Sequence, residues 1–119
     1  MAMLPFAATI AMRVPLLAAD LAALAVAMPE AMPLPPADEA AAWGTLYVVE
    51  GSRLGGALLA RAVPAQWPAA YLGAVHPTGG WRAICTAIDA AAANRPPGWR
   101  ERMVASALET FDLYARAAR

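Results

Sequence analysis

Prolines divide this chain into segments, and alanine fills the segments between them. The 119 residues include 11 prolines, most of them gathered at 29–36, 64–68 and 96–97, and 33 alanines. Alanine has the highest intrinsic helix propensity, whereas proline removes a backbone donor and ends a helix. Since no stretch shows the apolar and polar alternation of a strand, the chain is predicted to be all-α.

The apolar spacing predicts four helices, over 15–28, 39–63, 81–93 and 99–118. An extended, proline-rich linker (28–36) follows the first helix. Asp38 is the expected N-cap of the second helix, and Pro64 ends it. Glycine and proline break the segment 65–80, and a turn cluster occupies 94–98. A chain of this length suits one core, so residues 1–119 are expected to form a single domain.

The third and fourth predicted helices each present an apolar face. On the third helix this face comprises Trp81, Ile84, Cys85 and Ile88. On the fourth it comprises Met103, Ala107, Leu108, Phe111 and Tyr114. Cys85 is therefore expected to be a buried small hydrophobic residue.

The composition argues against several functional classes. Nine arginines balance nine acidic residues, so the net charge is zero, and a nucleic-acid binder would need a basic patch. The single cysteine and the single histidine, His76, exclude an internal disulfide and a multi-histidine metal site. No metal ligand set is expected. A Ser–His–Asp triad has no support either, because His76 lies in a glycine-rich loop.

The apolar start of the chain is not expected to cross a membrane. Arg13, Pro15 and Asp20 interrupt it before the roughly 20 apolar residues of a membrane span accumulate. Residues 1–3 also lack the positive charge of a secretory signal. A cytoplasmic protein without a membrane partner is the expectation.

Three glycines lie close together in the second predicted helix, within the run LYVVEGSRLGGALLAR. Each of Gly51, Gly55 and Gly56 costs about 1 kcal/mol relative to alanine inside a helix. Gly51 and Gly55 lie one turn apart on one face, so another group can approach the backbone there, and the helix can bend. A neighbouring helix and a flat cofactor both fit this spacing, whereas a phosphate loop would need a preceding strand and a lysine.

The same run resembles the distal-helix motif of the bacterial, biliverdin-producing haem oxygenases, particularly those that serve bacteriophytochromes. The likeness extends to VPLLAADLAAL and its proline-rich linker, to the loop before Trp81-Arg82 and to the Ala107…Phe111 stretch. It covers the chain from about Arg13 onward. The resemblance implies a haem-oxygenase-like helical bundle, with haem as both substrate and cofactor.

The resemblance also assigns roles to individual residues. The three glycines match those that let the distal helix bend over the haem face and leave space for O2. Ser52 stands where animal-type enzymes carry an aspartate that organises distal water. Arg82 matches a basic position that meets a haem propionate, and Tyr47 borders the same pocket. The expected catalytic residues are Gly51, Ser52, Gly55 and Gly56, and the expected haem-binding residues are Tyr47, Gly51, Gly55, Gly56 and Arg82.

One feature of the family is missing from this chain. The family's iron ligand is a histidine on the first helix, upstream of the matched region, whereas His76 matches no ligand position and is expected to be an exposed loop residue. The resemblance therefore implies a partial, N-terminally truncated domain. In the complete family, O2 and electrons from a ferredoxin or reductase convert haem to biliverdin, CO and iron. The alternative is a non-catalytic helical remnant, or interaction module, whose glycine face packs against another helix.

Two charged pairs have helical spacing. Glu50 and Arg53 are spaced as an i,i+3 surface pair, with a Glu50 that turns inward at the pocket as the alternative. Asp112 and Arg116 are spaced as a solvated i,i+4 pair.

Overall fold

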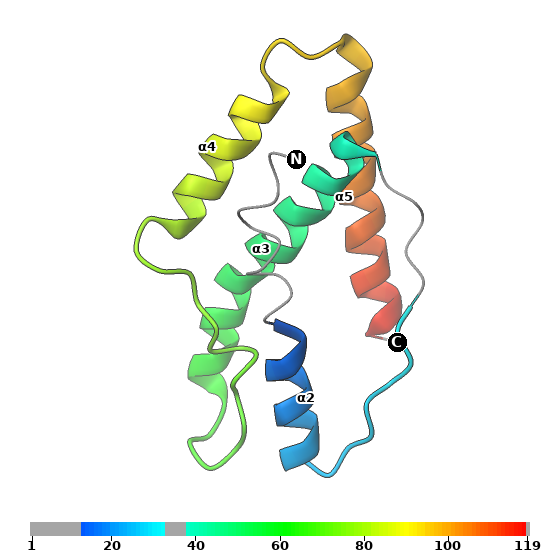
Figure 1. Cartoon of the computed structure of the whole chain (residues 1–119). Helices are drawn as coiled ribbons and strands as arrows, with labels where there is room; N and C mark the ends of the chain where they lie inside the picture. The colour runs from blue at the N-terminus through cyan, green and yellow to red at the C-terminus, as the bar shows by residue number, and fades with distance from the viewer. Residues whose placement is uncertain (1–12, 33–37, 119) are drawn as a thin grey trace.

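The computed structural model describes residues 13–32 and 38–118. Within these ranges the chain forms four helices, α2 (Arg13–Ala23), α3 (Glu39–Ala62), α4 (Gly80–Ala92) and α5 (Pro97–Ala117) (Figure 1). The helix α3 lies at the centre. Its most extensive contacts are with α5, which runs in the same general direction, while α4 runs the opposite way (Figure 1).

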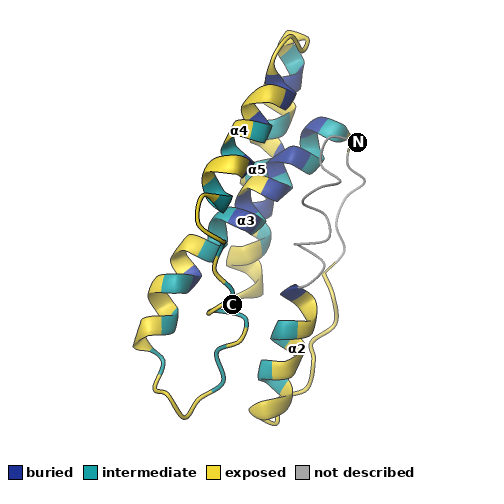
Figure 2. Ribbon diagram, turned by 60° about the vertical axis from the view of Figure 1, so that its left-hand side comes forward, coloured by how far each residue is buried: buried dark blue, intermediate teal, exposed yellow. Residues whose placement is uncertain are grey.

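The hydrophobic core lies where α3, α4 and α5 meet. Its largest members are Trp43 and Leu46 of α3, which are completely buried, together with Ile84, Ile88 and Trp99. The buried segments of these helices face one another, whereas the far end of α2 is exposed (Figure 2). The core therefore holds three helices together and leaves α2 to be attached by other contacts.

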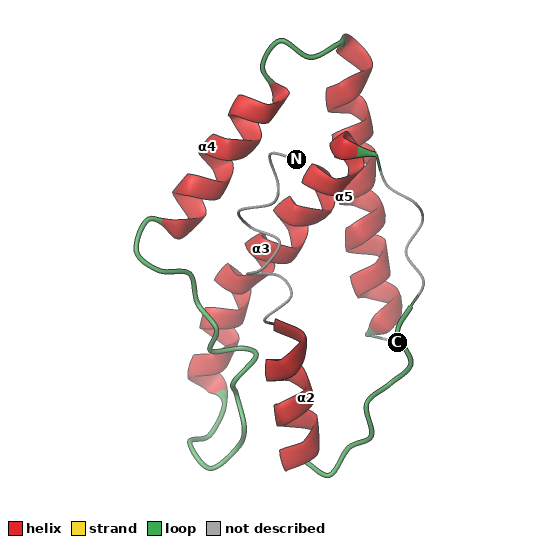
Figure 3. Cartoon of the chain, in the orientation of Figure 1, coloured by secondary structure: helices red, strands yellow, loops and turns green. Residues whose placement is uncertain are grey.

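The described residues contain helices and loops and no strand, so the all-α prediction is confirmed (Figure 3). Three of the predicted helices agree with the structure to within about two residues. Asp38 caps α3 as expected, because its side chain accepts a hydrogen bond of 2.8 Å from the Ala41 N–H. The predicted linker 28–36 has no regular structure as far as Met32, and its remainder lies outside the described residues.

The first predicted helix is shorter than expected, because it ends at Ala23 rather than at residue 28. Ala25 adopts a left-handed conformation with φ of 56°. The N–H of Val26 then bonds to the Leu21 carbonyl (2.9 Å), and the N–H of Ala25 bonds to the Ala22 carbonyl (3.1 Å). This is a Schellman motif, in which glycine usually occupies the left-handed position. Because this position is occupied by Ala25, the sequence did not indicate that the helix ends here.

The interface between α3 and α5 is built on Gly44 and on hydroxyl groups. A Cβ atom on Gly44 would meet the Met103 carbonyl oxygen and would lie 3.0 Å from the Ala107 nitrogen. Beside this crossing, the Ser106 hydroxyl donates to the Ala41 carbonyl (2.6 Å), and the Thr45 hydroxyl lies 3.2 Å from the Ser106 oxygen. The two backbones thus approach closely, because Gly44 has no side chain and because the hydroxyl groups of the interface form hydrogen bonds with one another and with a carbonyl group.

This packing leaves much of the expected apolar face of α5 exposed. The buried residues of α5 are Trp99, Ser106 and Thr110. Leu108 and Phe111 of the apolar stripe are 64% and 53% exposed. Met103 packs against the core, whereas the rest of the stripe borders open grooves.

None of the helices in the described ranges is long and apolar enough to cross a membrane.

The close approach at Gly44 predicts opposite effects of the same substitution at two positions of α3. Gly44→Ala places a methyl group against the α5 backbone and should lower the free energy of unfolding by about 1–3 kcal/mol. Gly55→Ala is the matched control, because a Cβ atom there meets nothing within 4 Å. It should raise the free energy of unfolding by up to about 1 kcal/mol through helix propensity. Urea denaturation followed by circular dichroism measures both, and equal stabilisation by both changes would contradict the close α3–α5 contact.

Candidate functional site

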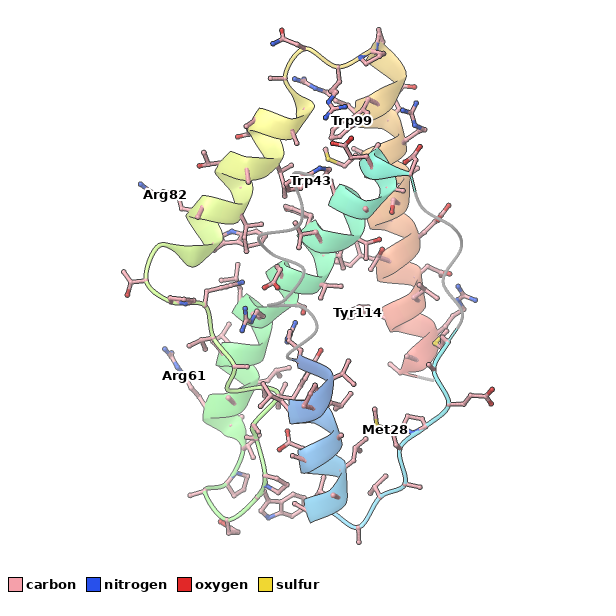
Figure 4. The ribbon with its side chains drawn as sticks, in the orientation of Figure 1. Met28, Trp43, Arg61, Arg82, Trp99 and Tyr114 are labelled. Atoms are coloured by element: carbon pink, nitrogen blue, oxygen red, sulfur yellow. The ribbon has the colours of Figure 1, made fainter. Side chains whose placement is uncertain are left out.

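A pocket of about 300 Å³ lies between α3, the start of α4 and the end of α5. Four of the six expected site residues line it, namely Tyr47, Gly51, Ser52 and Gly55. The other lining residues are Val48, Leu54, Trp81, Phe111 and Tyr114. Figure 4 shows where Tyr114 stands on α5. We call this the glycine pocket.

The three glycines of the motif have different surroundings. A Cβ atom on Gly51 would lie 3.1 Å from Cη2 of the Trp81 indole, so this glycine makes room for an aromatic side chain of the same protein. A Cβ atom on Gly55 would meet nothing within 4 Å. Gly56 is buried outside the pocket, where a Cβ atom would lie 3.2 Å from the Leu72 carbonyl oxygen. Among these three, only Gly55 borders open space.

Arg82 does not line the glycine pocket. Its exposed side chain points away from α3 (Figure 4) and lines a neighbouring recess of about 280 Å³. Arg53 and His76 line this second recess too, and Leu54 and Trp81 line both cavities. The Trp81 indole is thus a wall shared between the glycine pocket, which four aromatic side chains line, and a recess that two arginines line.

A third recess extends the glycine pocket along α5. It measures about 340 Å³ and shares Tyr47 and Phe111 with the glycine pocket. Its other lining residues are Gly44, Ile88, Met103, Val104, Ala107 and Leu108. The two cavities together form an apolar groove along the exposed stripe of α5.

Arg13 reaches the polar end of the glycine pocket, a role that the sequence reasoning missed. Its guanidinium donates to the Val49 carbonyl (2.8 Å) and to the Ser52 hydroxyl oxygen (3.1 Å), and it lies 4.4 Å from the centre of the Tyr71 ring. The Ser52 hydroxyl itself donates to the Val49 carbonyl (2.6 Å). Arg13 is 4% exposed, and its only signal in the sequence was an arginine in an apolar stretch.

Asp20 attaches α2 to the loop between α3 and α4. Its two carboxylate oxygens accept hydrogen bonds from the backbone N–H groups of Ala70 (2.9 Å) and Tyr71 (2.8 Å). Together with the contacts of Arg13, this attaches α2 to the middle of α3 and to the loop that follows α3.

Burial raises the pKa of the Tyr114 phenol above its ordinary value of 10.0. The neighbouring Tyr71 acts in the same direction, whereas Ser52 and Arg13 oppose it. Partial burial therefore favours the uncharged phenol at the pocket wall, although 40% of the residue is exposed.

Two expectations about charged residues are wrong. His76 is not an exposed loop residue, because its side chain is 7% exposed and its Nε2 lies 3.0 Å from Glu50 Oε2. Glu50 and Arg53 do form the expected i,i+3 pair, at 3.0 Å, but the pair is buried, with Glu50 completely inaccessible. The loop between α3 and α4 folds back over this face of α3, which spacing within one helix does not reveal.

The remaining expectations concern a surface pair and a cysteine. Asp112 and Arg116 form the predicted solvated pair, with 3.0 Å between carboxylate and guanidinium. Cys85 is free and half-buried rather than fully buried.

No metal cluster is present in the described part of the chain. Across residues 13–32 and 38–118, no group of three or more His, Cys, Asp and Glu side chains is placed to hold a metal ion. The glycine pocket is lined by no imidazole, and the Nε2 atom of His76 is engaged with Glu50.

Comparison with known proteins found one similarity that bears on function. Over 56 residues, which are 47% of this chain and 34% of the relative, the sequence is 48% identical to a protein named heme oxygenase from Xanthomonas campestris pv. campestris (strain 8004). The matched part thus spans about a third of that relative's length. No family model and no solved structure matches the chain.

The raised pKa of Tyr114 predicts a loss of stability at alkaline pH. The folded protein keeps the phenol proton at pH values at which the unfolded chain has lost it, so the free energy of unfolding falls as the pH rises from about 10 through the folded-state pKa. Tyr114→Phe should remove this part of the decline. Urea denaturation at several pH values between about 9 and about 11 tests it, and parallel curves for the two proteins would contradict the assignment.

Proposed function

We propose that this chain is part of a haem-oxygenase-like protein and that it holds haem against the Gly55 face of α3. The observation that carries the proposal is the open space at Gly55, within a pocket walled by aromatic side chains. The similarity to a protein named heme oxygenase supports the same identification. Residues 1–119 would then form one helical domain that is partial relative to the family.

The residues of the groove suit part of a haem molecule. The faces of Trp81 and Phe111 offer apolar contact to a flat macrocycle, and Gly55 lets that macrocycle approach the helix backbone. Arg82 in the adjoining recess offers positive charge to carboxylates at the edge of the ring. The described residues supply no axial imidazole there, so apolar contact dominates binding by this part of the protein.

When bound, haem would supply the iron at which O2 is activated. The chain's own contribution is positioning. Ser52 already donates its proton to the Val49 carbonyl and accepts one from Arg13, which leaves one lone pair on Oγ for a water molecule. Gly55 leaves room for a small ligand between the helix and the ring, and the protonated Tyr114 closes the pocket wall.

The remaining partners follow from the same proposal. A haem oxygenase needs O2 and an electron donor such as a ferredoxin or a reductase, and it releases biliverdin, CO and iron. A link to bacteriophytochromes rests on the likeness of the glycine motif, and a cytoplasmic location accords with the expectation from the sequence.

The alternative is an interaction module in which another helix covers the glycines. Within the described residues, the glycine that packs a helix is Gly44, which contacts α5, whereas Gly55 faces open space. This arrangement favours a ligand at Gly55. A helix from another chain would have to occupy the same space beside Gly55 as the ligand. A substitution that fills this space therefore tests both proposals.

Gly55→Leu should remove hemin uptake without harm to the helix. The added side chain occupies the space above the helix, while leucine is a better helix former than glycine by several tenths of a kcal/mol. Absorbance titration with hemin should show uptake weakened at least about tenfold, with unchanged helicity by circular dichroism. Ala62→Leu is the matched control, because it adds a leucine at an exposed position of α3 outside the pockets. Equal uptake by the Gly55 variant and the wild type would refute haem binding at this face.

The axial ligation of bound hemin should not depend on His76. Its Nε2 is bonded to Glu50, and the ring lies outside the glycine pocket. The absorbance spectrum of the hemin complex should therefore lack a six-coordinate imidazole signature, and His76→Ala should leave the positions of its bands unchanged. A band pattern typical of imidazole ligation that His76→Ala abolishes would contradict this arrangement.

A further inference from the structure

A buried cluster of charged side chains lies behind the aromatic wall of the glycine pocket, and the proposed haem site does not use it. Glu50 Oε2 lies 3.0 Å from both Arg53 Nη1 and His76 Nε2. The side chains of Glu50, His76 and Arg53 are 0%, 7% and 10% exposed. A carboxylate removed from water in this way is costly, so its two contacts through Oε2 are strong constraints on geometry.

The second carboxylate oxygen of Glu50 does not share in these contacts. Oε1 is buried and has no hydrogen-bond partner among the described residues. Among the described residues, the compensation for burying the carboxylate therefore comes from Arg53 and His76. Loss of either partner would leave the buried Glu50 carboxylate with one of its two contacts.

The cluster ties the loop between α3 and α4 to the central helix. Arg53 Nε donates to the Ala74 carbonyl (2.7 Å), and His76 follows two residues later. A Cβ atom on Gly80 would lie 3.1 Å from the His76 Cβ, so the loop folds tightly onto the start of α4. Glu50 thereby fixes the loop at the point where it leads into Trp81.

The imidazole of His76 packs against the indole of Trp81. The two ring centroids are 5.8 Å apart, and the rings are inclined by 32°. Trp81 also lies against Gly51 and against the Tyr47 ring, whose centroid is 5.6 Å away. The indole thus contacts both the charged cluster and residues of the glycine pocket, and it lines both cavities.

We infer that Glu50 and His76 are positioning residues for the ligand of the glycine pocket. The Glu50–His76 hydrogen bond fixes the imidazole, and the imidazole holds the Trp81 indole where a flat ring fits beside Gly55. The identity of that ring as haem rests on the proposed function. The positioning of Trp81 does not rest on the proposed function, because it is argued from contacts of the indole with His76, Tyr47 and Gly51.

Fluorine NMR on protein labelled with 5-fluorotryptophan observes the indole directly. The chain contains four tryptophans, so four resonances are expected, and Trp81→Phe assigns the one of interest. His76→Phe keeps a ring but removes the hydrogen bond, and Glu50→Gln keeps the side-chain volume but removes the charge. Asp112→Asn is the matched control, because it neutralises an exposed carboxylate that is also paired with an arginine.

We expect His76→Phe and Glu50→Gln to shift or broaden the Trp81 resonance, while the other three tryptophan resonances stay in place. The hemin dissociation constant should rise about tenfold in both variants and remain unchanged in Asp112→Asn. General destabilisation would instead affect all four resonances together. If His76→Phe does not fold, Glu50→Gln decides the matter.

Two results would overturn the inference: a Trp81 resonance identical to that of the wild type in the Glu50 and His76 variants, or a displaced indole without any loss of hemin affinity. If the wild-type protein takes up no hemin, the proposed function fails. The Trp81 resonance alone then supports or overturns the positioning role.

Discussion

The crossing of α3 and α5 at Gly44 determines where the rest of the molecule can place its apolar surface. At this crossing the two backbones touch, and the neighbouring hydroxyls of Thr45, Ser106 and Thr110 bond to one another and to carbonyl groups. An interface of small polar residues is satisfied by short hydrogen bonds and needs no large side chain. The apolar stripe of α5 is therefore left to border the groove that includes the glycine pocket. Had Leu108 and Phe111 packed against α3, that groove would be closed.

Charged residues attach the elements that the core does not reach. Arg13 and Asp20 hold α2 through contacts with backbone groups of α3 and of the loop that follows it. Glu50 holds the same loop through His76, and Arg53 through the Ala74 carbonyl. Backbone groups in a folded loop need partners, and a charged side chain provides a strong, directional one. The walls of the glycine pocket consequently depend on polar contacts that lie outside it.

Much of the fold was predictable from the sequence, because alanine and proline act locally. Asp38 and Pro64 bound α3, and Pro96 precedes α5, while Gly79 and Asn94, both with positive φ, flank α4, so these bounds involve only neighbouring residues. The end of α2 was not predictable in this way, since Ala25 adopts a conformation that usually selects glycine. Gly44 was overlooked because it stands apart from the other glycines of its helix.

The site was predictable only in part, for a different reason. Helical spacing brings Tyr47, Gly51, Ser52 and Gly55 to one face, and they do line one pocket. Spacing does not say what covers a neighbouring face. For that reason Glu50 was assigned to the surface and His76 to an exposed loop, whereas the loop folds over Glu50 and buries both.

The four glycines of α3 show how little a glycine motif alone specifies about a ligand. Gly44 meets the α5 backbone, Gly51 an indole, Gly56 the Leu72 carbonyl, and Gly55 open space. A flat ligand at Gly55 gains its binding free energy largely from apolar contact, which has no direction of its own. Its orientation must then come from groups with a fixed position or a charge, and among the described residues Arg82 of the adjoining recess and the Trp81 indole lie at this end of the molecule. The Trp81 indole packs against His76, which bonds to the buried Glu50 carboxylate, so a charged side chain without surface exposure is linked to the wall that the two cavities share.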